Sequence, residues 1–172
     1  MQKVVLTGYM GSGKSVVAAQ LAQKLHCDWI DLDQEIEKVA GISIAKLFES
    51  KGELYFRKLE HELFIQLLAS SESLIISTGG GTPCYYNNHQ LLQQTDVASF
   101  YLKAAIPTLV SRLQSERSKR PLLANLTEVD LEEYIAKHLF DRNFYYLQSK
   151  FVITVDEKTV EQIADEIIGR LT

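Results

Sequence analysis

The sequence predicts an α/β fold in which helices cover both faces of a parallel β-sheet. Short segments rich in β-branched and aromatic residues recur along the chain, and longer segments with helical spacing of apolar residues separate them. Strands that alternate with helices form parallel sheets, because each helix carries the chain back across the sheet. Five segments are predicted to be strands: Val4–Leu6, Trp29–Leu32, Leu74–Ser77, Val97–Leu102 and Phe151–Val155.

Length and charge predict one globular domain over residues 1–172 and disfavour several classes of partner. A chain of 172 residues buries roughly 70% of its unfolded surface, enough for a core without disulfides or a structural metal. A net charge of −4 disfavours nucleic acid and anionic membrane surfaces as partners. No apolar segment approaches the roughly 20 residues of a membrane span, so we expect a cytoplasmic protein. Cys27 and Cys84 form no metal-binding or disulfide pattern, and we expect both to be buried.

A phosphate-binding loop follows the first predicted strand. The segment Gly8–Ser15 reads G-x-x-x-x-G-K-S, and a predicted amphipathic helix begins at its end. The glycines let backbone N–H groups turn toward phosphate oxygens, and Lys14 adds a positive charge near the β- and γ-phosphates. Ser15 is placed to hold Mg²⁺. A dinucleotide-binding fingerprint is excluded, because its third glycine would fall on Val16.

Two carboxylates follow the second predicted strand. Asp31 and Asp33 are two positions apart, so on an extended chain both side chains face the same side of the sheet. Ligands of open parallel sheets bind at this carboxyl edge. One carboxylate can hold Mg²⁺, and the other can accept the proton of an attacking hydroxyl. The alternative interpretation of Asp33 is an ordinary helix N-cap ahead of Gln34.

The stretch between the second and third strands is too long for one helix. Glycines at Gly41 and Gly52 break it into about three helical pieces, and we expect residues 33–62 to be an insertion that builds part of a substrate site. Arg57 is followed three positions later by Glu60, which can hold the guanidinium in a fixed pose. An arginine held in this way is a good clamp for a carboxylate.

Three consecutive glycines, Gly79, Gly80 and Gly81, follow the third predicted strand. A bare backbone at the carboxyl end of a strand lets a ligand approach closely, although an unspecialised turn is the alternative.

Positive charge is concentrated ahead of Pro121. Four cations fall within nine residues, and they predict a lid over residues 112–124 that closes on phosphates; a solvated basic loop is the alternative. We expect the charged run from Glu116 to Arg120 to lie outside regular helix. The four cations are Arg112, Arg117, Lys119 and Arg120.

Arg142 lies in a helix-like stretch, where it is equally well interpreted as a surface residue or a ligand-binding one. The neighbouring aromatic residues, Phe144, Tyr145 and Tyr146, are expected in the core. The histidines form no metal-spaced pair and are assigned no role: His26, His61, His89 and His138.

With these residues together, the chain resembles the shikimate kinases, small members of the nucleoside-monophosphate-kinase-like group of P-loop proteins. The resemblance runs from Lys3 to about Tyr146, and the chain departs from the family pattern R-x-P-x-Y in having Phe144 in place of the proline. The resemblance rests on Asp31-x-Asp33, Leu47-Phe48 followed by Gly52-Glu53-x-x-Phe56-Arg57-x-x-Glu60, Gly79-Gly80-Gly81, and Arg120-Pro121-Leu122-Leu123.

The resemblance implies a monomeric P-loop kinase with sheet order 2-3-1-4-5 and a lid, which uses ATP and Mg²⁺ to phosphorylate the 3-hydroxyl of shikimate on the route to aromatic amino acids. It implies catalytic roles for Lys14, Asp33 and Arg120. The implied ATP-binding residues are Gly11, Ser12, Gly13, Lys14, Ser15, Val16, Arg112 and Arg120. The implied shikimate-binding residues are Asp33, Arg57, Gly79, Gly80, Gly81 and Arg142. Ser15 and Asp31 are the implied Mg²⁺ residues.

Several alternatives remain open at this stage. Gluconate or a nucleoside monophosphate could be the acceptor, because the phosphate loop and lid are shared across the group. A non-catalytic ATP-binding module would carry the same loop, whereas a GTP-dependent switch is disfavoured by the absence of an Asn-Lys-x-Asp motif. Arg117 competes with Arg120 as the lid arginine. The loop Asp156–Thr159 is expected to border adenine but carries no motif that names its contacts.

Overall fold

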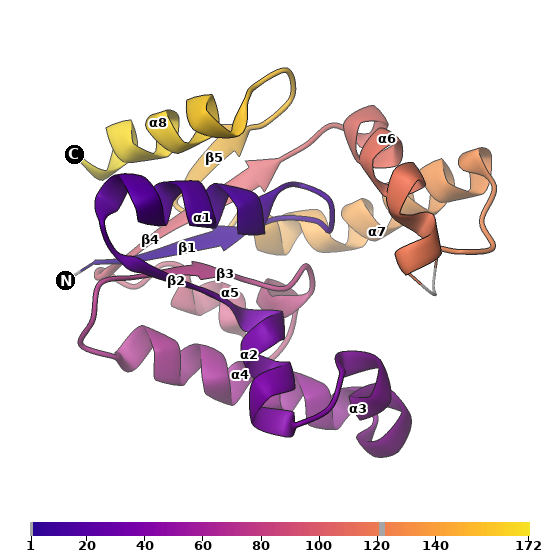
Figure 1. Cartoon of the computed structure of the whole chain (residues 1–172), viewed down its shortest axis with the longest axis horizontal. Coiled ribbons are helices and arrows are strands. Elements are labelled where there is room, and N and C mark those ends of the chain that lie inside the picture. Colours follow the sequence, from indigo (N-terminus) through magenta and orange to yellow (C-terminus); the bar gives the residue numbers. More distant parts are fainter. Residues whose placement is uncertain (1, 121–122) are drawn as a thin grey trace.

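The computed structural model describes residues 2–120 and 123–172, and a five-stranded parallel sheet forms its centre (Figure 1). The sheet order is β2-β3-β1-β4-β5, and each neighbouring pair is parallel. Both the α/β class and the order implied by the resemblance are confirmed. The strands are β1 (Lys3–Thr7), β2 (Asp28–Asp31), β3 (Leu74–Ser77), β4 (Val97–Lys103) and β5 (Phe151–Thr154).

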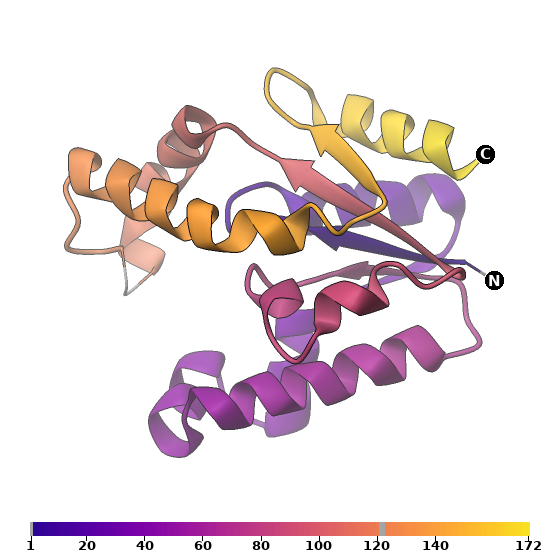
Figure 2. The ribbon, with the colours of Figure 1, turned by 180° about the vertical axis from the view of Figure 1, so that it is seen from behind.

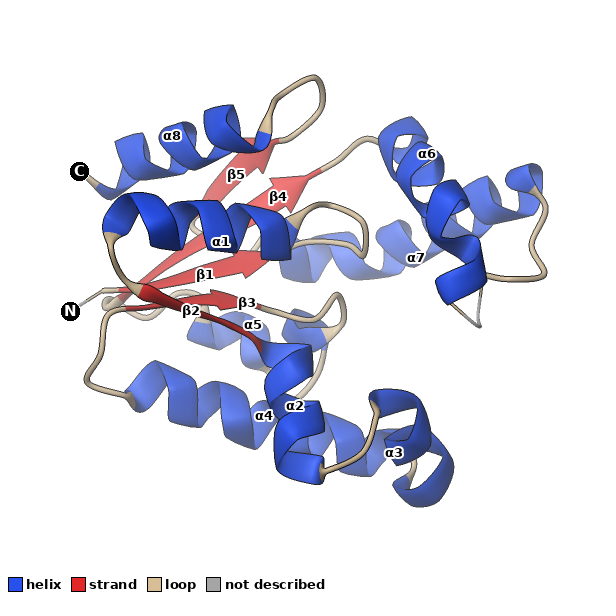
Figure 3. Cartoon of the chain, in the orientation of Figure 1, coloured by secondary structure: helices blue, strands red, loops and turns tan. Residues whose placement is uncertain are grey.

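Helices lie on both faces of the sheet, as Figure 3 shows. They are α1 (Lys14–Leu25), α2 (Leu32–Ala40), α3 (Ile44–Lys51), α4 (Glu53–Ala69), α5 (Asn88–Leu91), α6 (Ile106–Glu116), α7 (Glu128–Tyr146) and α8 (Val160–Leu171), with 3₁₀ turns η1 (Thr82–Cys84) and η2 (Arg117–Lys119).

Alternation along the strands divides the core between the two faces. Val4 and Leu6 of β1 pack in one apolar cluster with residues of α1 and α8, whereas Val5 packs in a second cluster with residues of α4. Successive strand residues point to opposite faces, so a short apolar strand supplies both clusters. Seen from behind, α4 and α7 run across the face of the sheet opposite α1 (Figure 2).

The insertion between β2 and β3 consists of the three helices α2, α3 and α4, as predicted. Gly41 ends α2 with a φ of 71°, a left-handed conformation that costs glycine little. Ser43 begins α3, where its hydroxyl accepts the N–H of Lys46. Gly41 thus lies between α2 and α3, and Gly52 lies between α3 and α4, as the sequence predicted.

The basic segment is more helical than expected. Glu116 is the last residue of α6, and Arg117–Lys119 continues directly as the 3₁₀ turn η2, so the expectation that the charged run lies outside regular helix is wrong for these residues; it is confirmed for Arg120, which is extended. The predicted lid over residues 112–124 therefore begins inside α6. Its residues Pro121 and Leu122, which belong to the Arg120-Pro121-Leu122-Leu123 motif, lie outside the described residues.

Two predictions about the core are wrong. Phe144 is 61% exposed, whereas Tyr146 is fully buried. The two lie two positions apart on α7, about 200° around the helix, so they cannot share its buried face. Cys27 and Cys84 are only partly buried. Among the described helices, none is both long and apolar enough to cross a bilayer.

Candidate active site

The loop between β1 and α1 wraps around the ammonium group of Lys14. Gly8 has a φ of 146°, and a Cβ atom there would lie 2.8 Å from both the Leu102 carbonyl oxygen and the Ser12 Oγ. Gly13 precedes α1 with a φ of 94°. Lys14 donates from Nζ to the carbonyl oxygens of Gly8 at 2.7 Å and Tyr9 at 3.0 Å. The loop therefore folds as a phosphate-binding turn at the N-terminus of a helix.

Burial shifts the acid–base balance of Lys14. Lys14 is 9% exposed, and the loss of solvent lowers its pKa to about 8. The Asp33 and Asp31 carboxylates act in the opposite direction and raise it. Arg120 and Arg142 lower that pKa further through charge repulsion. The Lys14 ammonium is therefore charged at neutral pH but loses its proton at a lower pH than an ordinary lysine does.

Asp31, rather than Asp33, is the N-cap of α2. Its Oδ1 accepts the N–H groups of Asp33 at 3.0 Å and Gln34 at 3.3 Å, and its Oδ2 accepts the Ser15 hydroxyl at 2.6 Å. Strand β2 ends at Asp31, so the pair does not share an extended strand as expected. The helix begins two residues earlier than an Asp33 N-cap would place it, and Asp33 reaches the site from its first turn.

The carboxyl group of Asp33 is partly buried beside the triple-glycine turn. Burial, together with the charges of Asp31 and Glu60, raises its pKa to about 6, while Lys14 and Arg57 act in the opposite direction. A carboxylate with a pKa near 6 is a stronger base than an ordinary aspartate. It is still ionised near neutral pH.

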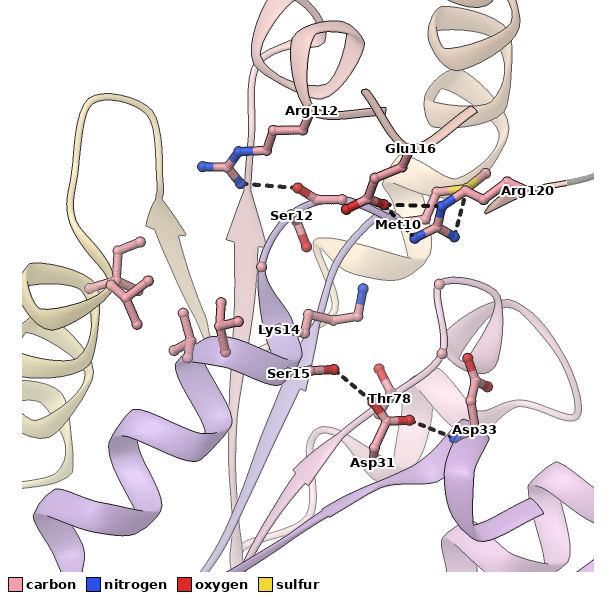
Figure 4. Close-up of a pocket in the computed structure, with 18 of the residues that line it drawn as sticks. Met10, Ser12, Lys14, Ser15, Asp31, Asp33, Thr78, Arg112, Glu116 and Arg120 are labelled. Atoms are coloured by element: carbon pink, nitrogen blue, oxygen red, sulfur yellow. Dashed lines mark hydrogen bonds and ion pairs between the residues drawn. The ribbon is translucent and has the colours of Figure 1, made fainter. Parts of the chain in front are cut away.

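One pocket of about 590 Å³ connects the phosphate loop to these carboxylates (Figure 4). In Figure 4 the Lys14 side chain lies between the Asp31–Asp33 side and the Arg120–Glu116 side of the pocket. The lining includes many of the predicted residues: Gly11, Ser12, Gly13, Lys14, Ser15, Val16, Asp31, Asp33, Gly79, Gly80, Arg112 and Arg120.

The lining also contains residues that the sequence did not single out as ligands. They come from the phosphate loop and α1, the end of β3, the C-terminal turns of α6, and the segment after β5: Met10, Val17, Thr78, Ser115, Glu116, Lys158, Val160 and Ile163. Lys158 belongs to the loop Asp156–Thr159. The Asp156 carboxylate anchors this loop by accepting the Thr108 hydroxyl at 2.6 Å. The two residues are far apart in the sequence, so no local motif predicts this contact.

The arginines of the basic segment point in different directions. Arg112 donates to the Gly11 carbonyl oxygen at 3.0 Å, which ties α6 to the phosphate loop. Arg120 lines the pocket, pairs with Glu116 at 3.2 Å, and lies 3.7 Å from the Met10 Sδ. Arg117 instead donates to the carbonyl oxygen of Leu126 and is not part of the pocket lining.

Arg57 and Arg142 lie against the triple-glycine turn rather than in the lining of that pocket. A Cβ atom on Gly81 would lie 2.6 Å from the Arg57 Nη2, and one on Gly80 would lie 3.2 Å from the Arg142 Nη1. The expected Arg57–Glu60 pair is present at 2.9 Å. Gly81 thus leaves the space that the Arg57 guanidinium occupies, and a side chain at Gly80 would crowd Arg142 more mildly.

The turn is further held by Tyr146, which was expected only as a core residue. Its hydroxyl donates to the Gly80 carbonyl oxygen at 2.6 Å, and burial raises its pKa well above the ordinary range of a tyrosine. Tyr146 lies one helical turn beyond Arg142 on α7. The two side chains thus reach the same turn from one face of the helix.

A family model described as shikimate kinase matches residues 10–172 of the chain. The chain belongs to the shikimate kinase family. A curated shikimate kinase from Flavobacterium johnsoniae is 54% identical over 171 residues, which cover 99% of each chain.

Solved shikimate kinase structures agree with the whole fold. The crystal structure of the enzyme from Bacteroides thetaiotaomicron has a TM-score of 0.88 and 32% identity, and the match covers 99% of this chain and 96% of that one. The enzyme from Acinetobacter baumannii, solved in complex with shikimate, also has a TM-score of 0.88, with 27% identity over 99% of this chain and 93% of that one.

Proposed function

We propose that this pocket transfers the γ-phosphoryl group of ATP to the 3-hydroxyl of shikimate. The observation that carries the proposal is the single pocket in which a phosphate loop faces a carboxylate of raised pKa, in a chain of the shikimate kinase family. Phosphoryl transfer to an alcohol needs charge neutralisation on one side of the γ-phosphate and an acceptor for the hydroxyl proton on the other. Lys14 and Asp33, which both line the pocket, supply these two groups.

The nucleotide lies along the phosphate loop in this proposal. Backbone N–H groups over residues 11–16 face the phosphates, Lys14 neutralises charge on the β- and γ-groups, and Arg120 reaches the transferring group. Arg112 lies beside this loop, on the side of the adenine ring, and Lys158 supplies a further cation to the lining.

The Ser15 and Asp31 side chains fit a Mg²⁺ ion. They are oxygen donors already in contact at 2.6 Å, of the kind that this hard cation prefers. Within the described ranges no group of three or more metal-ligating side chains exists, which suits an ion that takes its other ligands from water and nucleotide phosphates. Bound there, the ion would neutralise charge on the phosphate oxygens.

Asp33 is the base of the proposed reaction. Its carboxylate accepts the proton of the 3-hydroxyl as that oxygen forms a bond to the γ-phosphorus, and the bond from phosphorus to the ADP oxygen breaks in line. Arg57 and Arg142 hold the carboxylate of shikimate, and the bare backbone of residues 79–81 lets the ring approach. Positioning and electrostatics then supply most of the rate.

Two segments of the chain have separate roles in the proposed mechanism. The helices over residues 33–62 form the acceptor-binding part of one catalytic domain over residues 1–172, and residues 112–124 form the lid that excludes water from the γ-phosphate. Every proposed ligand belongs to one chain, which supports a monomer, and the use of ATP supports a cytoplasmic site of action.

Release of ADP from MgATP tests the proposal directly. Purified protein is incubated with shikimate, gluconate, several nucleoside monophosphates or no acceptor. Stimulation by shikimate alone, with ³¹P NMR showing a phosphate ester at the 3-position, is the expected result. Stimulation by another acceptor would overturn the substrate, and ATP binding without stimulation by any acceptor would favour a binding module.

A further inference from the structure

Behind the triple-glycine turn lies a series of buried polar side chains that do not belong to the lining of the phosphate pocket. Glu60 is 1% exposed, and its two carboxylate oxygens have different partners. Oε1 accepts the Arg57 Nη1 at 2.9 Å, and Oε2 accepts the Thr82 hydroxyl at 2.8 Å. Thr82, in η1, is fully buried. The orientation of the Arg57 guanidinium thus depends on a carboxylate that Thr82 holds from the other side.

Asn88 extends this series by one step. Its side chain is fully buried, and its Nδ2 donates to the backbone carbonyl oxygen of Thr82 at 2.9 Å. Its Oδ1 lies 2.6 Å from the Nδ1 of His61 on α4. Asn88 therefore ties the backbone of η1 to the helix that also carries Arg57 and Glu60.

The chain between Thr82 and Asn88 contains a tight turn, and a tyrosine just before it lies on the guanidinium. Tyr86 and Asn87 have φ values of 52° and 57°, a left-handed conformation that asparagine tolerates and that is unfavourable for tyrosine. The His61 ring stacks on Tyr86 with centroids 5.2 Å apart. Just before this turn, the Tyr85 ring lies 4.0 Å from the Arg57 guanidinium.

Removal of the Thr82 hydroxyl would leave one oxygen of a buried carboxylate without its donor. A buried charge without its hydrogen bond is unfavourable, so Glu60 would turn toward another donor and take Arg57 with it. The Arg57 guanidinium already occupies the space beside Gly81 that a Cβ atom would fill, so the turn limits its movement in that direction.

We propose that Thr82 and Asn88 are positioning residues for the acid substrate: through Glu60 they hold Arg57 in the orientation that receives a carboxylate. The inference rests on the proposed role of Arg57 as a carboxylate clamp. It predicts an effect confined to acceptor binding, because neither residue lines the pocket that holds the phosphate loop. A purely structural role would instead change thermal stability without separating the two substrates.

Variants of Thr82 provide the test. Thr82→Val keeps the shape of the side chain and removes its hydroxyl, while Thr82→Ser keeps the hydroxyl. We expect Thr82→Val to raise the KM for shikimate about tenfold, the effect of about 1.4 kcal/mol, and to leave the KM for ATP within about twofold. We expect Thr82→Ser to stay close to the parent enzyme. Should Thr82→Val fail to fold, Thr82→Ala removes the same hydroxyl with less apolar bulk.

The matched control is Ser99→Ala. Ser99 is also fully buried, and its hydroxyl donates to the Leu92 carbonyl oxygen at 2.8 Å, but it lies on β4 away from Arg57. This variant should lose stability without separating the two KM values. An unchanged shikimate KM in the Thr82 variants that lack the hydroxyl, or equal changes in both KM values, would overturn the inference.

A second readout separates this inference from the clamp itself. The ratio of kcat/KM for shikimate to that for its methyl ester measures how much the enzyme gains from the free carboxylate. Both Arg57→Ala and Thr82→Val should reduce this ratio, and Asn88→Ala should follow Thr82→Val. If Arg57→Ala leaves the ratio unchanged, the clamp proposal fails. If Arg57→Ala reduces it and Thr82→Val does not, only the positioning role fails.

Discussion

The Oδ1 atom of Asp33 lies 2.8 Å from the position that a Cβ atom on Gly79 would occupy. This relationship is repeated along the turn, where Arg142 approaches Gly80 and Arg57 approaches Gly81 in the same way. Each of the three glycines therefore faces one of the three side chains proposed to bind shikimate. The turn serves the site by leaving space for those side chains as well as for the ligand.

Gly79→Ala is expected to displace Asp33 and lower kcat about 100-fold, because a misplacement of about 1 Å at a reacting group has effects of this size. A methyl group at this position would also lie 3.1 Å from the Thr82 Oγ1, so it could not relieve the contact by moving away from Asp33 toward Thr82. Steady-state kinetics with both substrates measures the loss. Gly169→Ala, in α8 and with open space around it, is the control and should leave kcat unchanged. Normal turnover by Gly79→Ala would contradict the crowding argument.

The activity should have an acid limb set by Asp33, whose raised pKa of about 6 places its proton acceptance near neutral pH. The base works only when ionised, so kcat/KM for shikimate falls tenfold per pH unit below about 6 and is level above it. Asp33→Asn should remove nearly all turnover. A pH profile without an inflection between pH 5 and 7 would exclude Asp33 as the titrating base.

The same raised pKa predicts a change in stability with a definite sign. Between its ordinary pKa of 3.8 and about 6, the folded protein binds more protons at Asp33 than the unfolded chain does, so the free energy of unfolding decreases as pH rises through this window. Asp33→Asn should therefore raise that free energy at pH 7 by on the order of 1 to 2 kcal/mol. Urea denaturation of both proteins at pH 4 and pH 7 measures the difference, which should be several-fold smaller at pH 4.

The sequence was most informative where function depends on residues close together in the chain. The phosphate loop around Lys14, the helix breaks at Gly41 and Gly52, and the Arg57–Glu60 pair all follow from spacings of a few residues, and each is present as predicted. Local spacing is reliable here because one helical or strand geometry fixes which neighbours can meet.

Contacts between distant segments could not be read in the same way. Nothing near Thr82 indicates its bond to Glu60. The loop Asp156–Thr159 was expected beside the adenine ring, but no motif in it indicated that Lys158 would line the pocket. The other differences between expectation and structure concern where α2 begins and which side chains α7 buries. The N-cap of α2 is Asp31, two residues before the alternative position at Asp33. The exposure of Phe144 depends on which face α7 presents to the core.

The alkaline side of the pH profile should report Lys14. Burial lowers its pKa to about 8, so in the free enzyme the ammonium loses its proton above that pH and with it the charge that attracts phosphate. We expect kcat/KM for ATP to fall above about pH 8. Lys14→Arg keeps a cation at all accessible pH values, so its lower activity should lack this limb. A parent profile that stays level to pH 9.5 would show that Lys14 is not the titrating group.

Arg142→Ala is expected to weaken shikimate binding about 10- to 100-fold, the value of a hydrogen-bonded charge pair, and to leave ATP binding unchanged. Its guanidinium lies beside Gly80 but does not belong to the lining of the phosphate pocket, so we expect the loss to fall on shikimate. Isothermal calorimetry with each ligand measures both affinities. Arg170→Ala, on the exposed surface of α8, controls for the loss of one positive charge. Equal losses for shikimate and ATP would remove Arg142 from the clamp.

The choice between the two lid arginines can be decided by their variants. Arg120 lines the pocket and is held by Glu116 at 3.2 Å, whereas Arg117 is bonded to the backbone of Leu126. An arginine that stabilises the transferring phosphoryl group contributes on the order of 10³-fold or more to turnover. Arg120→Ala should therefore lose about that factor in kcat with a modest change in ATP affinity, while Arg117→Ala stays within a few-fold of the parent. Single-turnover kinetics at saturating ATP and shikimate isolates the chemical step, and the reverse order of losses would assign the role to Arg117.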